Sequence, residues 1–330
     1  MDISIIYVNW NSVDYLRESI VSVYEQTCNI RFEIIVVDNA SPTGDVDVLK
    51  EEFPDIILIK SSENLGFAGA NNVGYKKSSG KFLFFLNPDT KLVSPAINLM
   101  LKRMEYLPNV GILGCKLLNG DHSVQTSCIQ RFPTILNQTL DTDYLRRRWP
   151  NSTLWGIAPL FSSSSEPARV EVISGACMMI KRDVFERAGL FSEDYFMYAE
   201  DLDLCYKVVS AGFMNYYTGE ATVIHYGGKS STPQRATVMK WKAIVRFCVK
   251  TRGYVYGLLF RFVMILVAFG RLIIIGTFCV FGNTPGNKEA RYSVSEKWKA
   301  ILKTLLTESG SKGETLHGRS RVSDCSVPQA

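Results

Sequence analysis

The sequence predicts an α/β protein built on a mostly parallel, doubly wound sheet, and three observations support this fold class. Short apolar runs at residues 3–8, 32–37, 56–59 and 82–86 have the length of buried strands. Segments of helical periodicity separate these runs, as expected for right-handed crossovers between parallel strands. Polar residues follow the first, second and fourth runs, at the sheet edge where open α/β sheets bind ligands.

Helices are predicted from apolar spacing and from capping residues. Asn11 or Ser12 is a suitable cap for the first helix, and the pair Ser94-Pro95 is typical of a helix start. Gly212 is suited to ending the last helix of this region. The predicted helices are one with Leu16, Ile20 and Val23 on one face, followed by residues 68–78, 94–107, 183–188 and 199–211.

The pattern changes after residue 118. Asn119-Gly120 predicts a hairpin turn, and residues 120–168 are an irregular stretch rich in Ser, Pro and Arg. Residues 170–180 are then predicted to form a strand. We expect the irregular stretch to be an insertion that shapes the site of a second substrate. Its three consecutive arginines, residues 146–148, either bind an anionic group or form a solvated basic turn.

Charge is distributed unevenly along the chain. Residues 1–228 contain 20 Lys and Arg against 27 Asp and Glu, whereas residues 229–330 contain 17 against 5. A basic region beside an acidic body indicates contact with an anionic surface. Because the basic residues are interleaved with a long aliphatic band and not with stacking aromatics, we expect an anionic membrane and no nucleic acid.

Residues 253–282 contain Arg261 and Arg271 as their only charges, and the apolar stretches between them are too short for a spanning helix of about 20 residues. The two arginines lie about 80° apart on a continuous helix, so both point to one side. This pattern favours a helix in the membrane interface with its arginines at the headgroups. The alternatives are a helix over residues 262–282 that spans the membrane, and a buried helical hairpin or dimer contact.

The cysteines and the N-terminus bear on the compartment. The eight cysteines are scattered, and no two are closer than Cys115 and Cys128, which favours neither a zinc site nor a disulfide framework. A reducing compartment is the simplest interpretation. A basic segment followed by an apolar one is missing at the start of the chain, so we do not expect a cleaved secretory signal.

The strand ends carry candidate ligand-binding residues. Residues 38–41, Asp-Asn-Ala-Ser, combine a carboxylate and an amide suited to a nucleobase or ribose, although the same residues also favour turns and caps. Residues 63–72 place small residues at a helix start, where backbone amides can approach a phosphate or sugar. The packing of a helix start against the sheet is the alternative explanation of this second segment.

Carboxylates further along the chain are candidates for metal binding and base catalysis. Asp89 follows a buried strand as part of Asn87-Pro88-Asp89, and one carboxylate plus phosphate oxygens is a usual setting for Mg²⁺ or Mn²⁺. His225 follows another apolar run and is a possible second ligand. Asp201 begins a predicted helix, whose dipole favours the ionised form that a general base needs, with Glu200 and Asp203 beside it. A strand-ending turn and an acidic first helical turn are the structural alternatives.

These motifs together resemble the inverting family 2 glycosyltransferases with a GT-A-like nucleotide-sugar fold, and most closely the bacterial rhamnosyltransferase branch of polysaccharide assembly. The resemblance extends from residue 3 to about residue 229. One departure concerns Asn87, which stands where many relatives have an acid, so metal affinity is expected to be weaker or to depend on donor. The motifs that carry the resemblance are residues 37–41, 64–68, 87–89, 174–176 and 200–205.

The resemblance implies a role for each candidate residue. Asp201 is the expected catalytic base with Glu200 beside it, and Asp89 and His225 are the expected ligands of Mg²⁺ or Mn²⁺. The implied domains are a nucleotide-sugar-binding half at 1–118, an acceptor and catalytic half at 119–235, an amphipathic membrane-associating region at 236–308 and a disordered tail at 309–330. The implied donor-binding residues are Asn9, Asp38, Asn39, Asn64, Gly66, Phe67, Asn72 and Asn87.

The implied activity is inverting transfer of a sugar, with dTDP-rhamnose as the first expected donor and a UDP-sugar as the second. The expected acceptor is a hydroxyl of a lipid-linked saccharide in O-antigen-like polysaccharide assembly, on the cytoplasmic face of the bacterial inner membrane. A non-catalytic carbohydrate-binding protein on the same fold is an alternative. A Rossmann oxidoreductase lacks support because Asn9-Trp10-Asn11-Ser12 replaces the glycine-rich first turn, and a glycoside hydrolase requires two opposed carboxylates.

Overall fold

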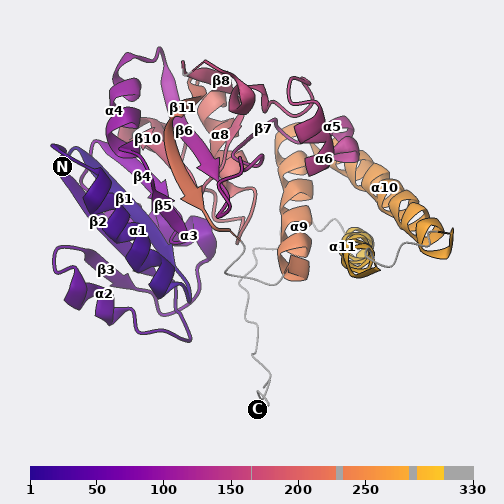
Figure 1. Ribbon diagram of the computed structural model, residues 1–330, viewed down its shortest axis with the longest axis horizontal. Coiled ribbons are helices and arrows are strands. Elements are labelled where there is room, and N and C mark those ends of the chain that lie inside the picture. The colour runs from indigo at the N-terminus through magenta and orange to yellow at the C-terminus, as the bar shows by residue number, and fades with distance from the viewer. Residues whose placement is uncertain (165, 228–232, 282–287, 308–330) are drawn as a thin grey trace.

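The computed structural model describes residues 1–164, 166–227, 233–281 and 288–307, arranged as shown in Figure 1. A nine-stranded sheet has the order β3-β2-β1-β4-β10-β6-β11-β5, with β8 paired to β11. The chain therefore has the expected α/β architecture with a mostly parallel sheet. The predicted tail at residues 309–330 lies outside the described residues.

The first half of the sheet is wholly parallel. β1 (Ile3–Asn9) lies between β2 (Phe32–Asp38) and β4 (Phe82–Leu86), and β3 (Ile57–Lys60) follows on the far side of β2. Every residue of β1 is buried, as expected for a central strand that is covered on both faces. Because Asn9 pairs in register with Asp38, the polar ends of these two strands lie side by side.

The second half of the sheet is mixed. β10 (Cys177–Lys181) runs antiparallel between β4 and β6 (Val110–Leu118), while β11 (Met214–His225) is parallel to β6. Two short strands, β5 (Thr90–Leu92) and β8 (Ala168–Val170), pair antiparallel with β11. β8, β10 and β11 come from the later part of the chain, where strands no longer alternate regularly with helices, whereas β5 directly follows β4.

The prediction of one strand over residues 170–180 is wrong. The chain instead forms β8, then β9 (Val172–Ile173), and only after a turn at residues 174–176 does it enter β10. β9 leaves the large sheet and pairs with β7 (Ile129–Gln130). A single apolar run cannot reveal this break, because the change of partner is set by elements distant in sequence.

The predicted helices are present, with ends shifted by one or two residues. α3 starts two residues earlier than expected, and Gly212, which follows α8, has φ +87° and ends that helix as predicted. The helices of the α/β body are α1 (Val13–Gln26), α2 (Asp47–Glu52), α3 (Gly66–Lys77), α4 (Ala96–Tyr106), α7 (Arg182–Arg187) and α8 (Glu200–Ser210).

The stretch predicted to be irregular contains short helices. α5 (Ile135–Leu140) and α6 (Asp143–Arg148) are followed by the 3₁₀ turn η1 (Ala158–Phe161). The side chains of Thr134 and Thr142 accept hydrogen bonds from backbone N–H groups of the first turns of α5 and α6. Helices of six residues are too short to produce a recognisable periodicity, which explains why the sequence pattern did not reveal them.

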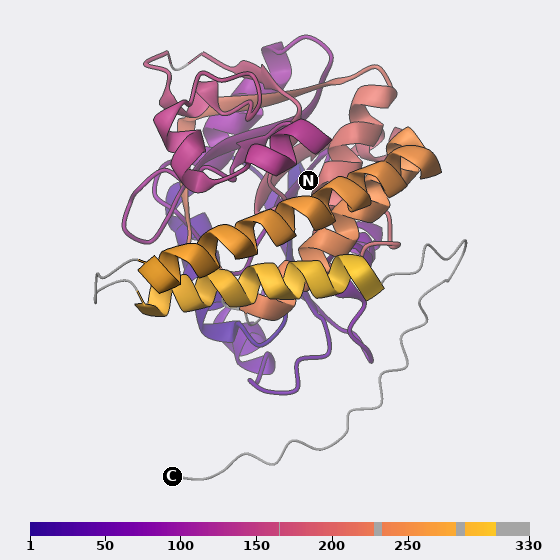
Figure 2. The same ribbon diagram turned by 90° about the vertical axis from the view of Figure 1, so that its right-hand side faces the viewer.

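Three long helices follow the sheet. They are α9 (Pro233–Arg252), α10 (Tyr254–Phe281) and α11 (Lys288–Thr307), and Figure 2 shows α10 and α11 side by side along one side of the molecule. Phe260, Met264 and Trp298 are buried between these helices. Phe247 of α9 belongs to the core of the α/β body, so α9 connects the helical region with the sheet.

The segment Tyr254–Thr277 of α10 is long and apolar enough to cross a membrane, and 17% of it is buried. Arg261 and Arg271 have partners within the protein, so their predicted contact with lipid headgroups stays a prediction. Arg261 donates to the carbonyl oxygens of Leu305 and Leu306, and Arg271 donates to the carbonyl of Thr139. Both arginines do lie on one side of α10 as predicted, but this is the side that packs against the protein.

Candidate active site

The ends of β1 and β2 form the first part of the site. The side-chain N–H of Asn9 donates to Oδ1 of Asp38 at 2.8 Å, and the hydroxyl of Ser41 donates to the same oxygen at 2.6 Å. Asn9 is wholly buried and Asp38 nearly so. The carboxylate of Asp38 is therefore held in one orientation at the sheet edge, with acceptor capacity left on Oδ2.

Asn39 holds the segment that leads into α3. Its side-chain N–H donates to Oδ1 of Asn64 at 2.9 Å and to the carbonyl of Gly66 at 3.1 Å, and its Oδ1 accepts from the N–H of Leu65. Every polar atom of the Asn39 amide thus has a protein partner. Asn39 positions the loop, whereas the exposed Asn64 is the accessible member of the pair.

Gly66 begins α3 at a place where no other residue fits. Its φ is +71°, and a Cβ added there would lie 2.2 Å from the carbonyl oxygen of Phe196. The same carbonyl accepts a 2.8 Å hydrogen bond from the N–H of Phe67. This close approach brings the start of α3 against the loop that precedes α8, so two segments far apart in sequence meet beside the sheet edge.

Asn72 makes a second connection between these segments. Its amide N–H donates to the carbonyl of Phe191 at 3.0 Å and to Oε1 of Glu193 at 2.9 Å, and its Oδ1 accepts from the N–H of Phe191. Asn72 is buried. The structure therefore occupies this side chain with the loop before α8, and any contact of Asn72 with a donor stays a prediction.

The predicted metal ligands lie together at the ends of β4 and β11. Nε2 of His225 is 3.4 Å from Oδ1 of Asp89 and 3.3 Å from Nδ2 of Asn87. Asp89 is buried, and Oδ1 of Asn87 is a buried oxygen without a hydrogen-bond partner among the described residues. Oδ1 of Asp89 and Nε2 of His225 thus lie together, and Asn87 presents its amide nitrogen to the histidine, so the metal-binding roles of all three stay predictions.

Gln125 sets the orientation of His225. Its Nε2 donates to Oδ1 of Asn119 at 3.0 Å, which directs its Oε1 toward Nδ1 of His225 at 2.8 Å. Nδ1 therefore carries the proton, and Nε2 presents its lone pair toward Asp89. A cation bound there would have Nε2 of His225 and Oδ1 of Asp89 as its protein ligands.

The candidate ligands fit a divalent cation that is held by only a few protein atoms. Within the described ranges, no group of three His, Cys, Asp or Glu side chains is placed to hold a metal. Asp89 and His225 would supply two ligands, and Asn87 an amide oxygen. Mg²⁺ and Mn²⁺ at phosphate sites commonly take one or two carboxylates and complete their coordination with substrate oxygens.

Asp201 lies at the start of α8 beside the turn at residues 174–176. Its Oδ2 accepts from the N–H of Gly175 at 3.0 Å, and its Oδ1 accepts from the N–H of Leu202 at 2.8 Å. Burial raises the pKa of Asp201 above its ordinary value, while these two hydrogen bonds oppose that rise. Asp201 is only half-buried, so its carboxylate remains accessible as a proton acceptor.

Glu200 differs from its neighbour in environment. Burial, together with the charge of Asp201, raises the pKa of Glu200 well above its ordinary value. Oε2 of Glu200 is buried without a hydrogen-bond partner among the described residues. The proton is therefore held more tightly on Glu200 than on a carboxyl in water, and the two hydrogen bonds that favour the ionised form are found on Asp201 alone.

The turn at residues 174–176 connects Asp201 with the predicted metal ligands. The N–H of Asn87 donates to the carbonyl of Ala176 at 3.0 Å, and the adjacent Gly175 contacts Asp201 as described above. A Cβ added to Gly175 would lie 3.3 Å from Cβ of Asp201 and 3.5 Å from Cε1 of Phe67. Residues of β4, α3 and α8 are thus gathered around one turn.

Asp203 has a structural role despite its place in the acidic cluster. It is buried, and it accepts from the hydroxyl of Ser192 and forms an ion pair with Lys250 of α9 at 2.9 Å. Asp203 therefore connects α8 with α9. Gln125 was missed by the sequence analysis, because nothing near it in the sequence indicates its distant partner His225.

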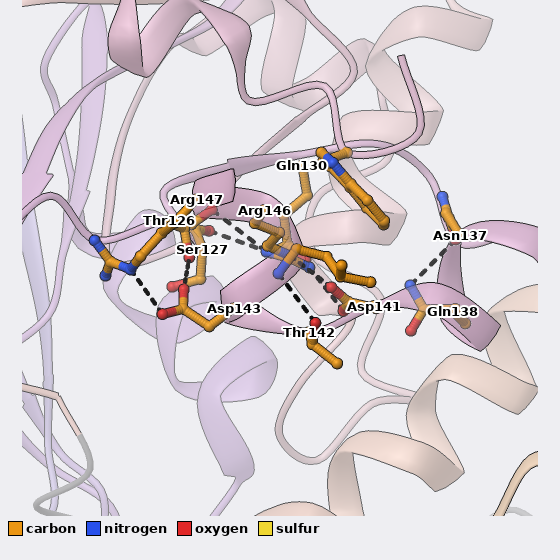
Figure 3. Close-up of polar contacts among 12 residues, drawn as sticks. Thr126, Ser127, Gln130, Asn137, Gln138, Asp141, Thr142, Asp143, Arg146 and Arg147 are labelled. Carbon is orange, nitrogen blue, oxygen red and sulfur yellow. Dashed lines mark hydrogen bonds and ion pairs between the residues drawn. The ribbon is translucent and has the colours of Figure 1, made fainter. Parts of the chain in front are cut away.

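Two of the three consecutive arginines support the insertion and do not face a ligand. Arg146 forms a two-pronged ion pair with Asp141 and donates to the carbonyl of Thr126, as Figure 3 shows. Arg147 pairs with Asp143, whose other oxygen accepts from the hydroxyl of Thr126. Farther along the 126–130 segment, the carbonyl of Cys128 accepts a hydrogen bond from the N–H of Ser174, in the turn at residues 174–176. The arginines thus brace α6 against the segment that supports that turn.

The fold and the sheet edge define a GT-A-like α/β protein, and comparison with known proteins identifies the family. Residues 4–189 match the family model described as Glycosyl transferase family 2. Because the match covers more than half of the chain, this protein belongs to that family and is a glycosyltransferase. The resemblance noted from the motifs is confirmed, while Glu200 and Asp201 lie beyond the matched region.

The chain is similar to several curated proteins. It is 28% identical over 211 residues to an N-acetylglucosaminyl-diphospho-decaprenol L-rhamnosyltransferase of Mycobacterium tuberculosis H37Rv, covering 60% of this chain and 67% of that protein. It is 24% identical over 200 residues to the rhamnosyltransferase WbbL of Escherichia coli K12, and this match covers 57% of this chain and 71% of that protein. It is 27% identical over 230 residues to the O-antigen biosynthesis protein RfbC of Myxococcus xanthus, and this match covers 69% of this chain but only 17% of that protein.

Solved structures share the fold. The mannosyltransferase PcManGT of Pyrobaculum calidifontis, solved with GDP-Man and Mn²⁺, superposes with a TM-score of 0.59 at 15% identity, covering 92% of this chain and 86% of that one. GalNAc-T7, solved with UDP, GalNAc and Mn²⁺, superposes with a TM-score of 0.56 at 16% identity, and the match covers 76% of this chain and 48% of that one. At these identities, the likeness concerns the fold alone.

Proposed function

We propose that this glycosyltransferase inverts the configuration of a sugar that it moves from a nucleotide diphosphate to a hydroxyl of a lipid-linked saccharide, in polysaccharide assembly. Rhamnose from dTDP-rhamnose is the first candidate donor and a UDP-sugar the second. The names of the relatives support this choice, since they include rhamnosyltransferases and an O-antigen biosynthesis protein. The observation that carries the proposal is the turn at residues 174–176, which holds Asp201 through Gly175 and Asn87 through Ala176.

Asp201 acts as the general base. Its half-exposed carboxylate removes the proton from the acceptor hydroxyl while that oxygen attacks the anomeric carbon from the side opposite the diphosphate. The N–H groups of Gly175 and Leu202 keep the carboxylate oriented for this transfer. Burial and the charge of Asp201 raise the pKa of Glu200, and no hydrogen bond among the described residues orients its Oε2.

The donor is held along the carboxyl ends of β1, β2 and β4. Asp38 would accept hydrogen bonds from the base or ribose, and the exposed Asn64 and the start of α3 at Gly66 and Phe67 would line the sugar-phosphate part. Asp89, His225 and Asn87 would hold Mg²⁺ or Mn²⁺ at the diphosphate. A bound divalent cation stabilises negative charge on a leaving diphosphate.

The outer face of α10 would attach the protein to a membrane. Exposed apolar side chains recur there at intervals of three and four residues, and the inward-turned Arg261 and Arg271 leave them uninterrupted by charge within the described part of the helix. The larger members of this face are Val255, Leu259, Phe262, Leu266, Phe269 and Ile273.

The packing of α11 favours a helix that lies in the interface over one that spans the membrane. α11 runs beside α10, and its exposed Lys297 and Lys303 would enter the hydrocarbon if the pair crossed it. A lysine at the centre of a membrane costs about 2.5–3.5 kcal/mol. At the surface the same lysines lie near anionic headgroups, which stabilise them. The proposed location is therefore the cytoplasmic face of a bacterial inner membrane, as a monotopic protein.

A donor panel tests the proposed function. Purified full-length protein is incubated with dTDP-rhamnose, UDP-sugars and GDP-mannose, with Mn²⁺ or Mg²⁺ and bacterial membrane lipid extract, and released nucleotide diphosphate is measured. We expect release from one donor only when extract is present, together with a sugar-labelled lipid. Binding of a nucleotide sugar without any transfer would instead favour a non-catalytic carbohydrate-binding protein.

A further inference from the structure

A cavity of about 530 Å³ lies in the insertion, apart from the sheet edge. Leu140, Leu145, Leu154 and Trp155 contribute apolar walls, and Arg148 and Trp149 also line it. Its volume is within the range of sites that bury a small organic ligand. The nearly buried Trp155 donates from its indole N–H to the carbonyl of Trp149, which holds this wall in place.

Arg148 is the cation available at this cavity. Arg146 and Arg147 are occupied by Asp141 and Asp143, whereas exposed Arg148 has no ion pair with any described residue. Its guanidinium lies 5.7 Å from the ring centroid of Trp149. An apolar cavity with one accessible guanidinium matches a molecule that joins a hydrocarbon chain to a phosphate.

Hydrogen bonds link the elements around the cavity both to α10 and to the turn at residues 174–176. Leu140 ends α5, and α5 packs against α10 through a hydrogen bond from Arg271 to Thr139. Trp149, which lines the cavity, is more than half exposed, and tryptophan is enriched at membrane–water interfaces. On the other side, α6 is braced through Thr126 to the segment that supports Ser174 (Figure 3).

We propose that this cavity binds the first isoprenoid units of a lipid-linked diphosphate acceptor, with Arg148 on its phosphate. This inference rests on the proposed function and adds to it the place where the lipid part of the acceptor is recognised. A lipid held here reaches the membrane beside α10 and presents its sugar toward the body that carries Asp201.

Photolabelling in detergent tests the site without any donor. The probe is a polyisoprenyl diphosphate that carries a diazirine in its chain, and we expect labelled peptides within residues 140–155. Unlabelled polyisoprenyl diphosphate should compete about tenfold better than the corresponding alcohol, because one charge-assisted contact is worth about that factor. It should also compete better than inorganic pyrophosphate, which has no hydrocarbon chain to bury. Equal competition by phosphatidylglycerol would overturn the isoprenoid assignment, as would labelling confined to other segments.

Variants separate the two parts of the site. Leu145→Trp fills the cavity and should abolish labelling, whereas the matched Leu136→Trp, on the outer side of α5, should leave it unchanged. Arg148→Gln, an exposed substitution that does not threaten folding, should remove the advantage of the diphosphate over the alcohol. Unchanged labelling in Leu145→Trp, or an unchanged preference in Arg148→Gln, would contradict the proposal.

Turnover distinguishes failure of this inference from failure of the proposed function. If the wild-type protein transfers sugar to a lipid-linked acceptor and Leu145→Trp leaves the KM for that acceptor unchanged, the cavity inference alone fails. If residues 140–155 are labelled as expected but no nucleotide sugar supports transfer, the proposed function fails and the lipid site stands.

Discussion

The backbone N–H of Gly175 lies 3.0 Å from Oδ2 of Asp201, so the turn between β9 and β10 holds the carboxylate at the start of α8. One residue later, the carbonyl of Ala176 accepts from the N–H of Asn87. The predicted base and the predicted metal motif therefore share one support. This relationship underlies the first prediction.

Asp201→Asn should lower kcat by about 10² to 10⁴, the usual contribution of a positioned general base. The amide keeps the shape and one acceptor oxygen, so nucleotide-sugar affinity should be unchanged. Single-turnover assays with the preferred donor measure the first quantity and calorimetry the second. A variant with near-normal turnover would remove Asp201 from the mechanism.

Glu200→Gln should stabilise the protein at neutral pH. Because burial raises the pKa of Glu200 in the folded state, the folded protein binds the proton more tightly than the unfolded chain does, and stability falls as pH rises above the ordinary value of 4.5. Each pKa unit of this rise costs about 1.4 kcal/mol at pH above the folded pKa. The gain of the variant should disappear below pH 4.5, which urea unfolding at several pH values measures. A pH-independent difference would contradict this origin.

Gly66→Ala should lower the free energy of unfolding by about 1–3 kcal/mol through backbone strain. The clash of the added Cβ with the carbonyl of Phe196 should lower it further. Gly189→Ala is a matched control, since Gly189 has φ +80° but no atom within 4 Å of the added Cβ. Chemical denaturation should show a larger loss for Gly66→Ala. Donor binding should also weaken in that variant alone, because the start of α3 moves. Equal losses in the two variants would mean that the approach of Phe196 to Gly66 has no energetic importance.

Asp89→Ala should remove the metal dependence of nucleotide binding. Gln125→Leu should lower the metal affinity about 10- to 100-fold, as is common for residues that orient a metal-bound histidine. Calorimetry of nucleoside diphosphate with and without Mn²⁺ separates this effect from direct contact with the nucleotide. In the absence of metal, Gln125→Leu should bind nucleotide as the wild type does. Metal-dependent binding that survives Asp89→Ala would exclude the proposed ligand set.

The paired substitution Phe262→Gln and Leu266→Gln should reduce binding to phosphatidylglycerol vesicles at least tenfold, because each large apolar side chain contributes about 1.5–3 kcal/mol when buried. Tyr106→Gln is the control, since this side chain on α4 is 75% exposed but lies on the α/β body. Vesicle flotation measures both proteins. Retained flotation of the paired variant would place membrane contact elsewhere.

Much of the fold was predictable, because the signals of its first half are local. Buried parallel strands such as residues 3–8 and 82–86 form continuous apolar runs, and helices such as α1 and α4 have an apolar face that the sequence displays directly. The short strands β8 and β9 and the helices α5 and α6 were missed. Elements of two to six residues owe their conformation to distant partners more than to their own pattern.

The candidate site divides in the same way. By itself, the sequence determined which side chains end the strands and begin α8, since Asn9, Asp38, Asn87 and Asp201 follow from chain order and from the parallel arrangement. Only the tertiary structure decided that Gly175 meets Asp201, that Gln125 orients His225, and that Arg261 and Arg271 turn toward the protein. Hydrogen bonds between residues 26 to 132 positions apart leave no periodic trace, because either partner alone is compatible with many environments.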